Sequence, residues 1–375
     1  MEGKDSFLVS IIQLILSIFT NMKKNEYRLL GIMSGTSLDG VDLVFTELSF
    51  SNATNFKIIY SETIPYSEKW LNRLKNSSHL EPAELNDLDQ YYTKYLSEVI
   101  LKFIAKYDID LLDAICSHGH TVKHRPDRGL TFQIGNLPKL STLTGVPVVC
   151  DFRVQDVELG GQGAPLVPIG DRMLFSNYKY CINLGGFANI SEEVKGQRIA
   201  YDVCAVNTVL NHYVRSLDKD FDEDGNLART GKVNLELLEQ LNALKYFQKT
   251  PPKSLGIEWV DKYVLPLIDS YSLEIPDILR TFSEHIAIQI AACLKNASTS
   301  EILLTGGGTF NSFLIERFRS HSDGEFVIPK KEIIDYKEAL IFALLGALKL
   351  RGEINVLSSV TGAKMDHSSG RIYEP

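Results

Sequence analysis

The chain has 375 residues, of which 44% are hydrophobic and 23% charged, and this length and balance fit a globular protein of two domains. Its formal net charge of −8 excludes broad binding to nucleic acid, which depends on cationic surfaces. Its five cysteines are scattered without a Cys-x-x-Cys pair, which favours a reducing cytoplasm over a disulfide framework.

The start of the chain differs in composition from the rest. Phe7 to Phe19 are nearly all apolar, but the run is short for a transmembrane span and lacks a cleavage site of small residues. Met22-Lys23-Lys24 then resembles the start of a cytoplasmic protein. We therefore expect residues 1–22 to be an over-extended start outside the fold, without stable membrane association. A weak membrane anchor is the alternative.

Three β-like runs follow, and turn residues between them predict an antiparallel meander: Tyr27–Met33, Val41–Leu48 and Phe56–Thr63. The first turn combines hydroxyls, glycines and carboxylates. Glycine lets the backbone approach a ligand closely, consecutive backbone N–H groups can bind an anion, and carboxylates suit hydrated Mg²⁺. We predict a phosphate-binding hairpin, with Asp39 holding Mg²⁺ through water, from Ser34, Gly35, Thr36, Ser37, Asp39, Gly40 and Asp42. An ordinary glycine hairpin is the alternative.

This turn is neither of two familiar nucleotide motifs. A P-loop ends in Gly-Lys-Ser/Thr and opens a helix, whereas this stretch has no lysine and enters a strand. The dinucleotide fingerprint Gly-x-Gly-x-x-Gly is also absent from it.

Helices and strands then alternate, which predicts a mixed α/β sheet. Apolar residues at helical spacing predict helices over Ser67–Lys75 and Pro82–Tyr107, with a further helix near Leu137–Leu143. Short apolar runs predict strands over Leu112–Ser117, Thr131–Ile134 and Val146–Cys150.

The pattern restarts at Tyr178–Leu184, a strand that enters a second glycine turn at Gly185 and Gly186 and continues as a strand. A later strand, Glu301–Thr305, ends in a third turn made of Gly306, Gly307, Gly308 and Thr309. Further helices are predicted over Asn207–Leu217, Asn234–Leu244, Trp259–Tyr271, Pro276–Asn296, Asn311–Ser320 and Lys337–Leu350, and a strand over Glu325–Ile328.

We therefore predict an α/β protein with a two-lobed, actin-like ATPase fold, in which a ribonuclease H-like unit is duplicated around a cleft. The lobes are expected at residues 23–177 and 178–375, and the pattern leaves open whether the last segment returns to the first lobe. Glycine turns that face each other across the cleft would bind a polyphosphate from both sides.

Several polar stretches are candidates for chemistry. His118, His120 and His124 fit either a zinc site or separate hydrogen-bonding roles, and the lack of Cys or Glu nearby favours the second. Asp151 and Arg153 follow a strand, and Gln162 stands in the glycine-rich stretch beyond them, which suits either a polar small molecule or a local salt bridge. Asp202 and Glu338 are candidate general bases, or caps and surface acids.

Taken together, these stretches resemble the anhydro-N-acetylmuramic acid kinase family from Leu29 to about Ala363. The residues that carry the resemblance are Gly31 to Asp42, Ser117-His118-Gly119, Phe132 to Asn136, Asp151-Phe152-Arg153 with Asp156, Gly160 to Pro168, Asn183 to Phe187, Tyr201-Asp202 with Asn207, Phe221 to Gly225 with Gly231, Pro252-Lys253-Ser254, Gly306 to Asn311, Glu338 with Phe342-Ala343, and Ser359 to Ala363.

The resemblance implies a cytoplasmic, homodimeric kinase of cell-wall recycling. Such enzymes use ATP, Mg²⁺ and water to open 1,6-anhydro-N-acetylmuramic acid and phosphorylate its O6, giving N-acetylmuramate 6-phosphate and ADP. By the resemblance, Asp202 matches the catalytic base and Glu338 the acid that positions the water. It also implies sugar contacts from Ser117, His118, Gln133, Asp151, Arg153, Gln162 and Asn207.

The chain departs from the family pattern in two places. The family has Asp-x-Gly-Pro-Gly-Asn after the base, whereas this chain has Cys204-Ala205-Val206 between Val203 and Asn207, and His120 replaces the usual Gln. Both changes concern sugar preference. Two alternatives therefore stay open: a kinase of an ordinary open-ring hexosamine, and a non-catalytic ATP-dependent binding protein related to actin and the heat-shock chaperones.

Overall fold

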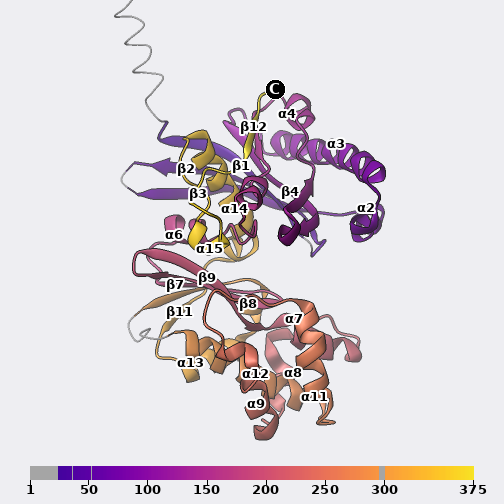
Figure 1. The fold of residues 1–375 in the computed structure, drawn as a ribbon, viewed down its shortest axis with the longest axis vertical. Helices are drawn as coiled ribbons and strands as arrows, with labels where there is room; N and C mark the ends of the chain where they lie inside the picture. Colours follow the sequence, from indigo (N-terminus) through magenta and orange to yellow (C-terminus); the bar gives the residue numbers. More distant parts are fainter. Residues whose placement is uncertain (1–23, 36, 52, 295–299) are drawn as a thin grey trace, which may run out of the picture.

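The structure is a computed structural model that describes residues 24–35, 37–51, 53–294 and 300–375. The apolar leader and Thr36, with its expected phosphate contact, lie outside the described residues. Two lobes are stacked along the longest axis of the molecule (Figure 1). Each lobe is a sheet with helices packed on it, which confirms the α/β class expected from the alternating pattern.

The first lobe contains a sheet with the strand order β12-β6-β4-β1-β2-β3, and β5 pairs with β4. β1, β2 and β3 form the expected antiparallel meander, whereas β4 and β6 run parallel to β1. The strands are β1 (Glu26–Ser34), β2 (Gly40–Phe50), β3 (Thr54–Pro65), β4 (Ala114–Arg125), β5 (Leu130–Ile134), β6 (Val148–Cys150) and β12 (Arg371–Tyr373).

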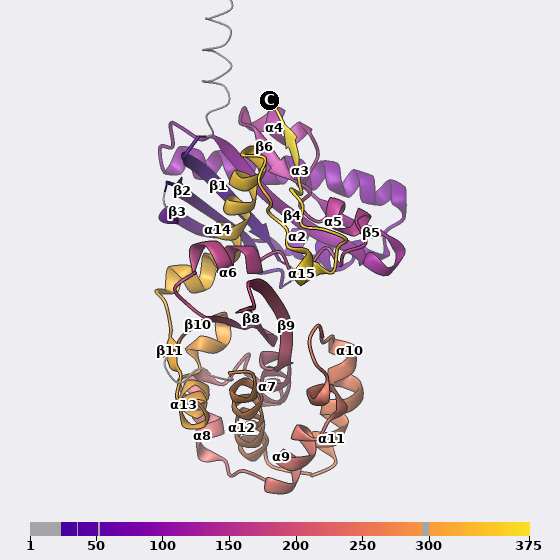
Figure 2. The same ribbon diagram turned by 60° about the vertical axis from the view of Figure 1, so that its left-hand side comes forward.

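Helices cover both faces of this sheet. One face packs on α3, whose Leu88, Tyr92 and Leu96 recur at helical spacing and are buried with residues of β1 and β2. The opposite face packs on α14 (Figure 2). The helices of this lobe are α2 (Glu68–Lys75), η1 (Ser77–His79), α3 (Pro82–Lys106), η2 (Pro126–Arg128), α4 (Lys139–Thr144), α5 (Val154–Glu158), α6 (Pro168–Leu174), α14 (Lys331–Leu350) and α15 (Ser358–Thr361).

The second lobe repeats this topology. Its sheet has the order β11-β10-β7-β8-β9, in which β7, β8 and β9 are antiparallel neighbours and β10 and β11 run parallel to β7. The duplication expected from the two strand–turn–strand patterns is thus present. The strands are β7 (Tyr180–Leu184), β8 (Phe187–Val194), β9 (Gln197–Ala205), β10 (Glu301–Thr305) and β11 (Glu325–Val327).

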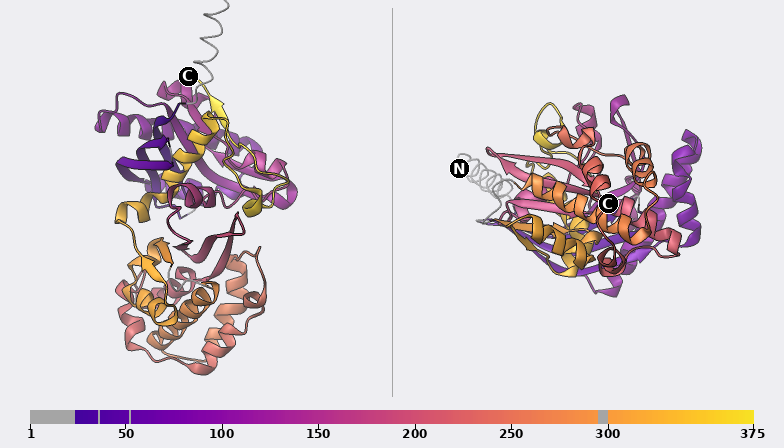
Figure 3. Two further views of the ribbon diagram at one scale, coloured as in Figure 1. Left: turned by 90° about the vertical axis from the view of Figure 1, so that its left-hand side faces the viewer. Right: turned by 90° about the horizontal axis from the view of Figure 1, so that it is seen from below.

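Helix α12, with 19 residues, lies at the centre of the second lobe and packs on α8, α9, α13 and β9. The other helices surround it (Figure 3). The helices of this lobe are α7 (Asn207–Val214), η3 (Arg215–Leu217), η4 (Glu223–Gly225), α8 (Asn226–Thr230), α9 (Leu235–Asn242), η5 (Lys245–Gln248), α10 (Ile257–Trp259), η6 (Val260–Val264), α11 (Leu265–Asp269), α12 (Ile275–Cys293), η7 (Gly307–Phe310) and α13 (Ser312–His321).

The end of the chain returns to the first lobe. α14 contacts β1, β2 and β4, and β12 pairs with β6 at the edge of the first sheet. Between the lobes, α6 contacts β3 on one side and β8 and β9 on the other. The first lobe is therefore built from both ends of the described chain.

Four elements differ from the sequence expectations. β4 continues through the histidine-rich stretch to Arg125, because β5 pairs with it there as a hairpin. α14 begins at Lys331, six residues before the expected start. α6 and β12 were not expected, since each is short and depends on tertiary partners. No helix within residues 24–294 or 300–375 is long and apolar enough to cross a membrane.

The packing of α14 on β1 requires a residue without a side chain at position 31. A Cβ atom on Gly31 would collide with the carbonyl oxygen of Ala339 and touch Ala343. Both contacts belong to a fully buried layer, where an added methyl group forces backbone shifts.

We therefore expect Gly31→Ala to lower the free energy of unfolding by about 3 kcal/mol, measured by urea denaturation. Gly307→Ala is the matched control, because nothing lies within 4 Å of a Cβ at that position. It should change stability by about 0.5 kcal/mol or less. Equal stability of the two variants would show that α14 does not depend on this close approach.

Candidate active site

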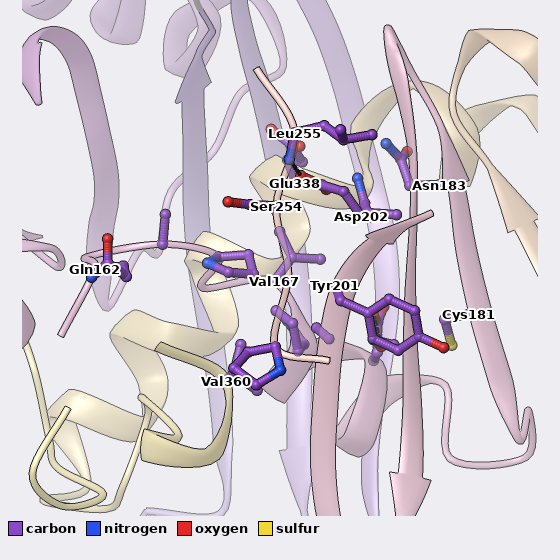
Figure 4. Close-up of a pocket in the computed structure, with 18 of the residues that line it drawn as sticks. Gln162, Val167, Cys181, Asn183, Tyr201, Asp202, Ser254, Leu255, Glu338 and Val360 are labelled. Carbon is purple, nitrogen blue, oxygen red and sulfur yellow. Dashed lines mark hydrogen bonds between the residues drawn. The ribbon is translucent and has the colours of Figure 1, made fainter. Parts of the chain in front are cut away.

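A pocket of about 930 Å³ lies between the lobes, within the size range of small-molecule sites (Figure 4). Four of the predicted site residues line it: Asp42, Gln162, Asp202 and Glu338. They come from β2, from the segment after α5, from β9 and from α14, so the pocket is assembled from both lobes and both halves of the chain.

Asp202 is held from three sides at the edge strand β9. Its carboxylate accepts a hydrogen bond from the backbone N–H of Leu255 at 2.8 Å, and its own N–H donates to the carbonyl of Lys253 at 3.2 Å. Its carbonyl accepts from the hydroxyl of Tyr246 at 2.6 Å. Burial raises the pKa of Asp202 above its ordinary value, and the Leu255 N–H partly opposes this rise. The carboxylate is thus oriented, with one oxygen left for a ligand.

Glu338 stands on the first half of α14 with its side chain open to the pocket. Enclosure by protein raises the pKa of its carboxyl group, whereas the positive charges of Arg153 and Lys337 lower it. Glu338 and Asp202 therefore bring two carboxyl groups with raised pKa values into one pocket, which is typical of acid–base sites.

The first hairpin places its predicted residues unequally. The Ser34 hydroxyl is buried, 2.5 Å from the Tyr66 hydroxyl and 3.0 Å from Nδ1 of His120, so it faces the core. Ser37 and Asp39 are exposed, and Gly35 is half-buried with an ordinary φ. Leu38, with φ 64°, makes the left-handed turn instead of a glycine. Gly40 is extended and packs so closely on Ile64 that a Cβ would collide.

Acidic side chains gather where the hairpin meets α14. Asp42, Asp335 and Glu338 line the pocket, and Asp42 accepts a hydrogen bond from Thr63 at 2.6 Å. Burial, together with the charges of Asp39 and Asp335, raises the pKa of Asp42. Repelling carboxylates of this kind fit a divalent cation. In the described part of the chain no three His, Cys, Asp or Glu side chains are placed to ligate a metal directly.

The glycine turns of the second lobe meet at the carboxyl ends of β7 and β10, where ligands bind in α/β sheets. Gly306 has φ 84°, and a Cβ there would contact the Leu184 backbone at 2.8 Å. Nothing lies within 4 Å of a Cβ at Gly307, so its backbone is open to a ligand. The turn at Gly185 and Gly186 accepts hydrogen bonds from the start of α7. These turns form a backbone cradle that fits a polyphosphate.

Three other predicted nucleotide or sugar residues of this lobe have structural contacts. Thr309 is buried and its hydroxyl donates to the Gly306 carbonyl at 2.7 Å. Gly308 packs against Leu184. Asn207 donates to the Leu184 carbonyl at 3.4 Å, so it joins the two glycine turns and does not line the pocket.

Besides Asn207, five residues predicted to contact sugar do not line the pocket. Ser117 accepts from the Gly119 N–H, and Gln133 donates to Thr131. The other three are His118, Asp151 and Arg153. The strands and loops that carry them pack against one another in the first lobe.

The strongest of these supporting contacts joins Arg153 to His118. Nε of Arg153 donates to Nε2 of His118 at 2.8 Å, and Nδ1 of His118 lies 2.9 Å from the Gly119 carbonyl. Burial, and then Arg153, hold the pKa of His118 well below its usual value, so the ring is neutral. Asp151 accepts from Asn136 at 3.1 Å, and burial raises its pKa.

The three histidines of β4 have separate partners, which confirms the hydrogen-bonding interpretation. His118 meets Arg153, His120 meets Ser34, and His124 lies 3.0 Å from the Thr131 hydroxyl. Burial lowers the pKa of His120 to about 4. His120 is therefore neutral and holds the end of β1 from which the first hairpin starts.

Sequence reasoning missed several pocket residues. Asn183, Tyr246, Lys249, Ser254 and Leu255 line the pocket. Pro252-Lys253-Ser254 was noted only as part of the family resemblance. The loop from Lys249 to Leu255 has no periodic pattern, and only its hydrogen bonds to β9 bring it to Asp202.

A buried ionic network joins the lobes beside the pocket. Asp171 of α6 pairs with Lys337 of α14 at 2.6 Å and accepts from Ser191 of β8 at 2.6 Å. Arg198 of β9 donates to Ser191 at 2.7 Å and lies 3.9 Å from Asp171. All four side chains are buried. The network fixes α14, and with it Glu338, relative to the strand that carries Asp202.

The chain is similar in sequence to proteins of one known family. A family model described as anhydro-N-acetylmuramic acid kinase matches residues 27–375. The anhydro-N-acetylmuramic acid kinase of Mannheimia succiniciproducens is 34% identical over 379 residues, which cover 94% of this chain and 100% of that protein. The protein of the same name from Coxiella burnetii is 33% identical over 372 residues, covering 94% and 98%.

Solved structures are more distantly similar. The activator of 2-hydroxyisocaproyl-CoA dehydratase from Clostridium difficile, with bound ADPNP, has a TM-score of 0.42 at 13% identity, covering 86% of this chain and 96% of that one. A ROK family glucokinase from Streptomyces griseus, in complex with glucose and AMPPNP, has a TM-score of 0.38 at 11% identity, covering 85% and 98%.

The ionic network yields a stability prediction. Lys337→Met keeps the apolar stem but leaves the Asp171 carboxylate without its nearest cation, and breaking a buried ion pair costs about 3–5 kcal/mol. We expect a loss of that size in urea denaturation. Lys331→Met on the same helix is the control, because its pair with Asp335 is exposed and contributes about 1 kcal/mol at most. Similar losses in both variants would contradict the structural role of Asp171.

Proposed function

The chain belongs to the anhydro-N-acetylmuramic acid kinase family, and from this we propose that it is an ATP-dependent kinase of cell-wall recycling. The substrate is 1,6-anhydro-N-acetylmuramic acid, and the products are N-acetylmuramate 6-phosphate and ADP. The single observation that supports this chemistry best is the pairing of Asp202 and Glu338 in one interlobe pocket beside open glycine turns.

The proposed mechanism begins with water. Asp202 accepts a proton as the water oxygen forms a bond to C1, and the C1–O6 bond breaks. O6 then forms a bond to the γ-phosphorus of ATP, and ADP leaves. Glu338 helps position the water, and the proton on Asp202 passes to solvent. The hydrogen bond from the Leu255 N–H orients Asp202 for this step.

The nucleotide phosphates are proposed to bind between the first hairpin and the second-lobe turns. Phosphoryl transfer depends mainly on positioning and charge stabilisation, and exposed backbone N–H groups supply both. Ser37, Gly35 and Gly307 present open backbone or hydroxyl groups there. Asp39 and Asp42 are the proposed residues for Mg²⁺ through water, which would neutralise phosphate charge.

The sugar is proposed to bind between Gln162 and Asp202, which line the pocket from opposite lobes. The other predicted sugar residues of the first lobe act by supporting this wall. Dispersed free cysteines and the family resemblance support work in the cytoplasm, and the resemblance supports a homodimer. The partners are the amino sugar and ATP.

An isotope experiment tests the reaction. In ¹⁸O-water the mechanism places one heavy oxygen on C1 of the product and none on the phosphate, which mass spectrometry of product fragments detects. Unlabelled product held in the same water for the same time controls for exchange at C1. Turnover of an open-ring hexosamine alone, without label at C1, would favour the alternative hexosamine kinase.

Asp202→Asn tests the base. We expect kcat to fall by about 10²- to 10⁴-fold because the amide cannot accept the proton, while ATP affinity by calorimetry stays unchanged. Only the ionised form of Asp202 acts as a base, and burial raises the pKa of its carboxyl group. As the pH is lowered, the unmodified enzyme should therefore lose activity at a pH higher than the ordinary pKa of an aspartate would predict.

Glu193→Gln is the control for this substitution. Glu193 lies on the neighbouring strand β8 but does not line the pocket. The kcat of the Glu193→Gln variant should therefore match that of the unmodified enzyme. A near-normal kcat for Asp202→Asn would remove this residue from the mechanism.

A further inference from the structure

Lys253 is a half-buried cation in the wall of the pocket. Its ammonium nitrogen lies 4.7 Å from the ring centre of Tyr246 and 5.8 Å from that of Tyr201. Among the described residues no carboxylate lies within 4.0 Å of this nitrogen. Burial lowers the pKa of Lys253, as expected for a cation with incomplete solvation. The two rings compensate part of its charge, and a bound anion would complete its coordination.

The other cations of the pocket are less suited to an anionic ligand. Lys337 is already paired with Asp171 at 2.6 Å. Lys249 is exposed, so water screens its charge. His124 is beside the Thr131 hydroxyl, and burial lowers its pKa. Lys253 is therefore the pocket-lining cation whose charge is least compensated by described neighbours.

The place of Lys253 separates it from the phosphate site. Its carbonyl accepts the Asp202 N–H at the outer edge of β9, and Figure 4 shows the following residues, Ser254 and Leu255, beside Asp202. Ala205 pairs with Phe187 at the glycine turn. It lies three residues beyond Asp202 on β9, which is roughly 10 Å from Asp202. The turn at Gly306 lies beyond three more strand spacings, roughly 14 Å.

An anion at Lys253 must therefore belong to the sugar. A muramic acid differs from a glucosamine by a lactyl ether at C3, which carries a carboxylate. Resting on the proposed function, we propose that Lys253 binds this lactyl carboxylate and determines specificity for muramyl over glucosaminyl substrates. The loop that contains Lys253 also hydrogen-bonds to Asp202. Binding of the carboxylate at Lys253 would therefore also place C1 of the sugar near the proposed base.

Calorimetric titration without ATP tests this inference with two ligands. One is 1,6-anhydro-N-acetylmuramic acid, and the other is its lactamide, in which a neutral amide replaces the carboxylate. The unmodified enzyme should bind the acid about ten- to a hundredfold more tightly, as expected for a charge-assisted hydrogen bond. Lys253→Met should bind both ligands with equal affinity. Lys253→Arg should retain a preference for the acid, because it keeps the charge.

Lys245→Met is the matched control, since it removes an exposed cation that does not line the pocket and should leave the preference intact. Thermal melting confirms that each variant is folded, and Lys253→Gln replaces Lys253→Met if the latter is not. Equal loss of affinity for both ligands in the Lys253 variants would overturn the inference and assign Lys253 to support of the loop. A preference for the acid that survives in Lys253→Met or Lys253→Gln would also overturn it.

The outcome separates the two proposals. If the unmodified enzyme phosphorylates the anhydro sugar but shows no preference for the acid, the role of Lys253 is wrong and the proposed function stands. If the unmodified enzyme neither binds nor phosphorylates the anhydro sugar, the proposed function fails, and the assignment of Lys253 fails with it.

Discussion

The close packing of α14 against β1 is the constraint on which the site depends. A helix can approach a strand this closely only where side chains are small, and here Gly31 meets the backbone of Ala339. The same helix carries Lys337 and Glu338 at its cleft end. Because α14 packs tightly on the first sheet, its position determines where Glu338 lies relative to the β1–β2 hairpin.

At this point the lobes are joined by a buried ionic network that lies next to an apolar cluster shared by both lobes. Asp171 lies between Lys337 and Arg198, with Ser191 completing its hydrogen bonds. Burial of such a group costs free energy unless every partner is present, so the network tolerates few relative positions of the two sheets. This rigidity is useful in a site where one carboxylate comes from α14 and the other from β9.

The proposed catalytic base is oriented mainly by the backbone. The N–H of Leu255 and the carbonyl of Lys253 hold Asp202, and the glycine turns are the proposed phosphate cradle. Backbone groups are fixed by the fold and do not reorganise during a reaction, which suits electrostatic stabilisation. The proposed mechanism accommodates Cys204-Ala205-Val206 after Asp202, because these residues are buried and the loop from Lys249 to Leu255 orients Asp202.

The sequence alone determined the two strand–turn–strand repeats and the helices with strong periodicity such as α3, because these depend on local pattern, and it proposed Asp202 and Glu338 as site residues. It did not determine α6, β12 or the loop at Lys253, which are short or aperiodic and gain their place from contacts distant in the chain. Only the tertiary structure decided which predicted polar residues line the pocket. His118 and Arg153 hydrogen-bond to each other and do not line the pocket, whereas Lys253 lines it and has no carboxylate within 4.0 Å among the described residues.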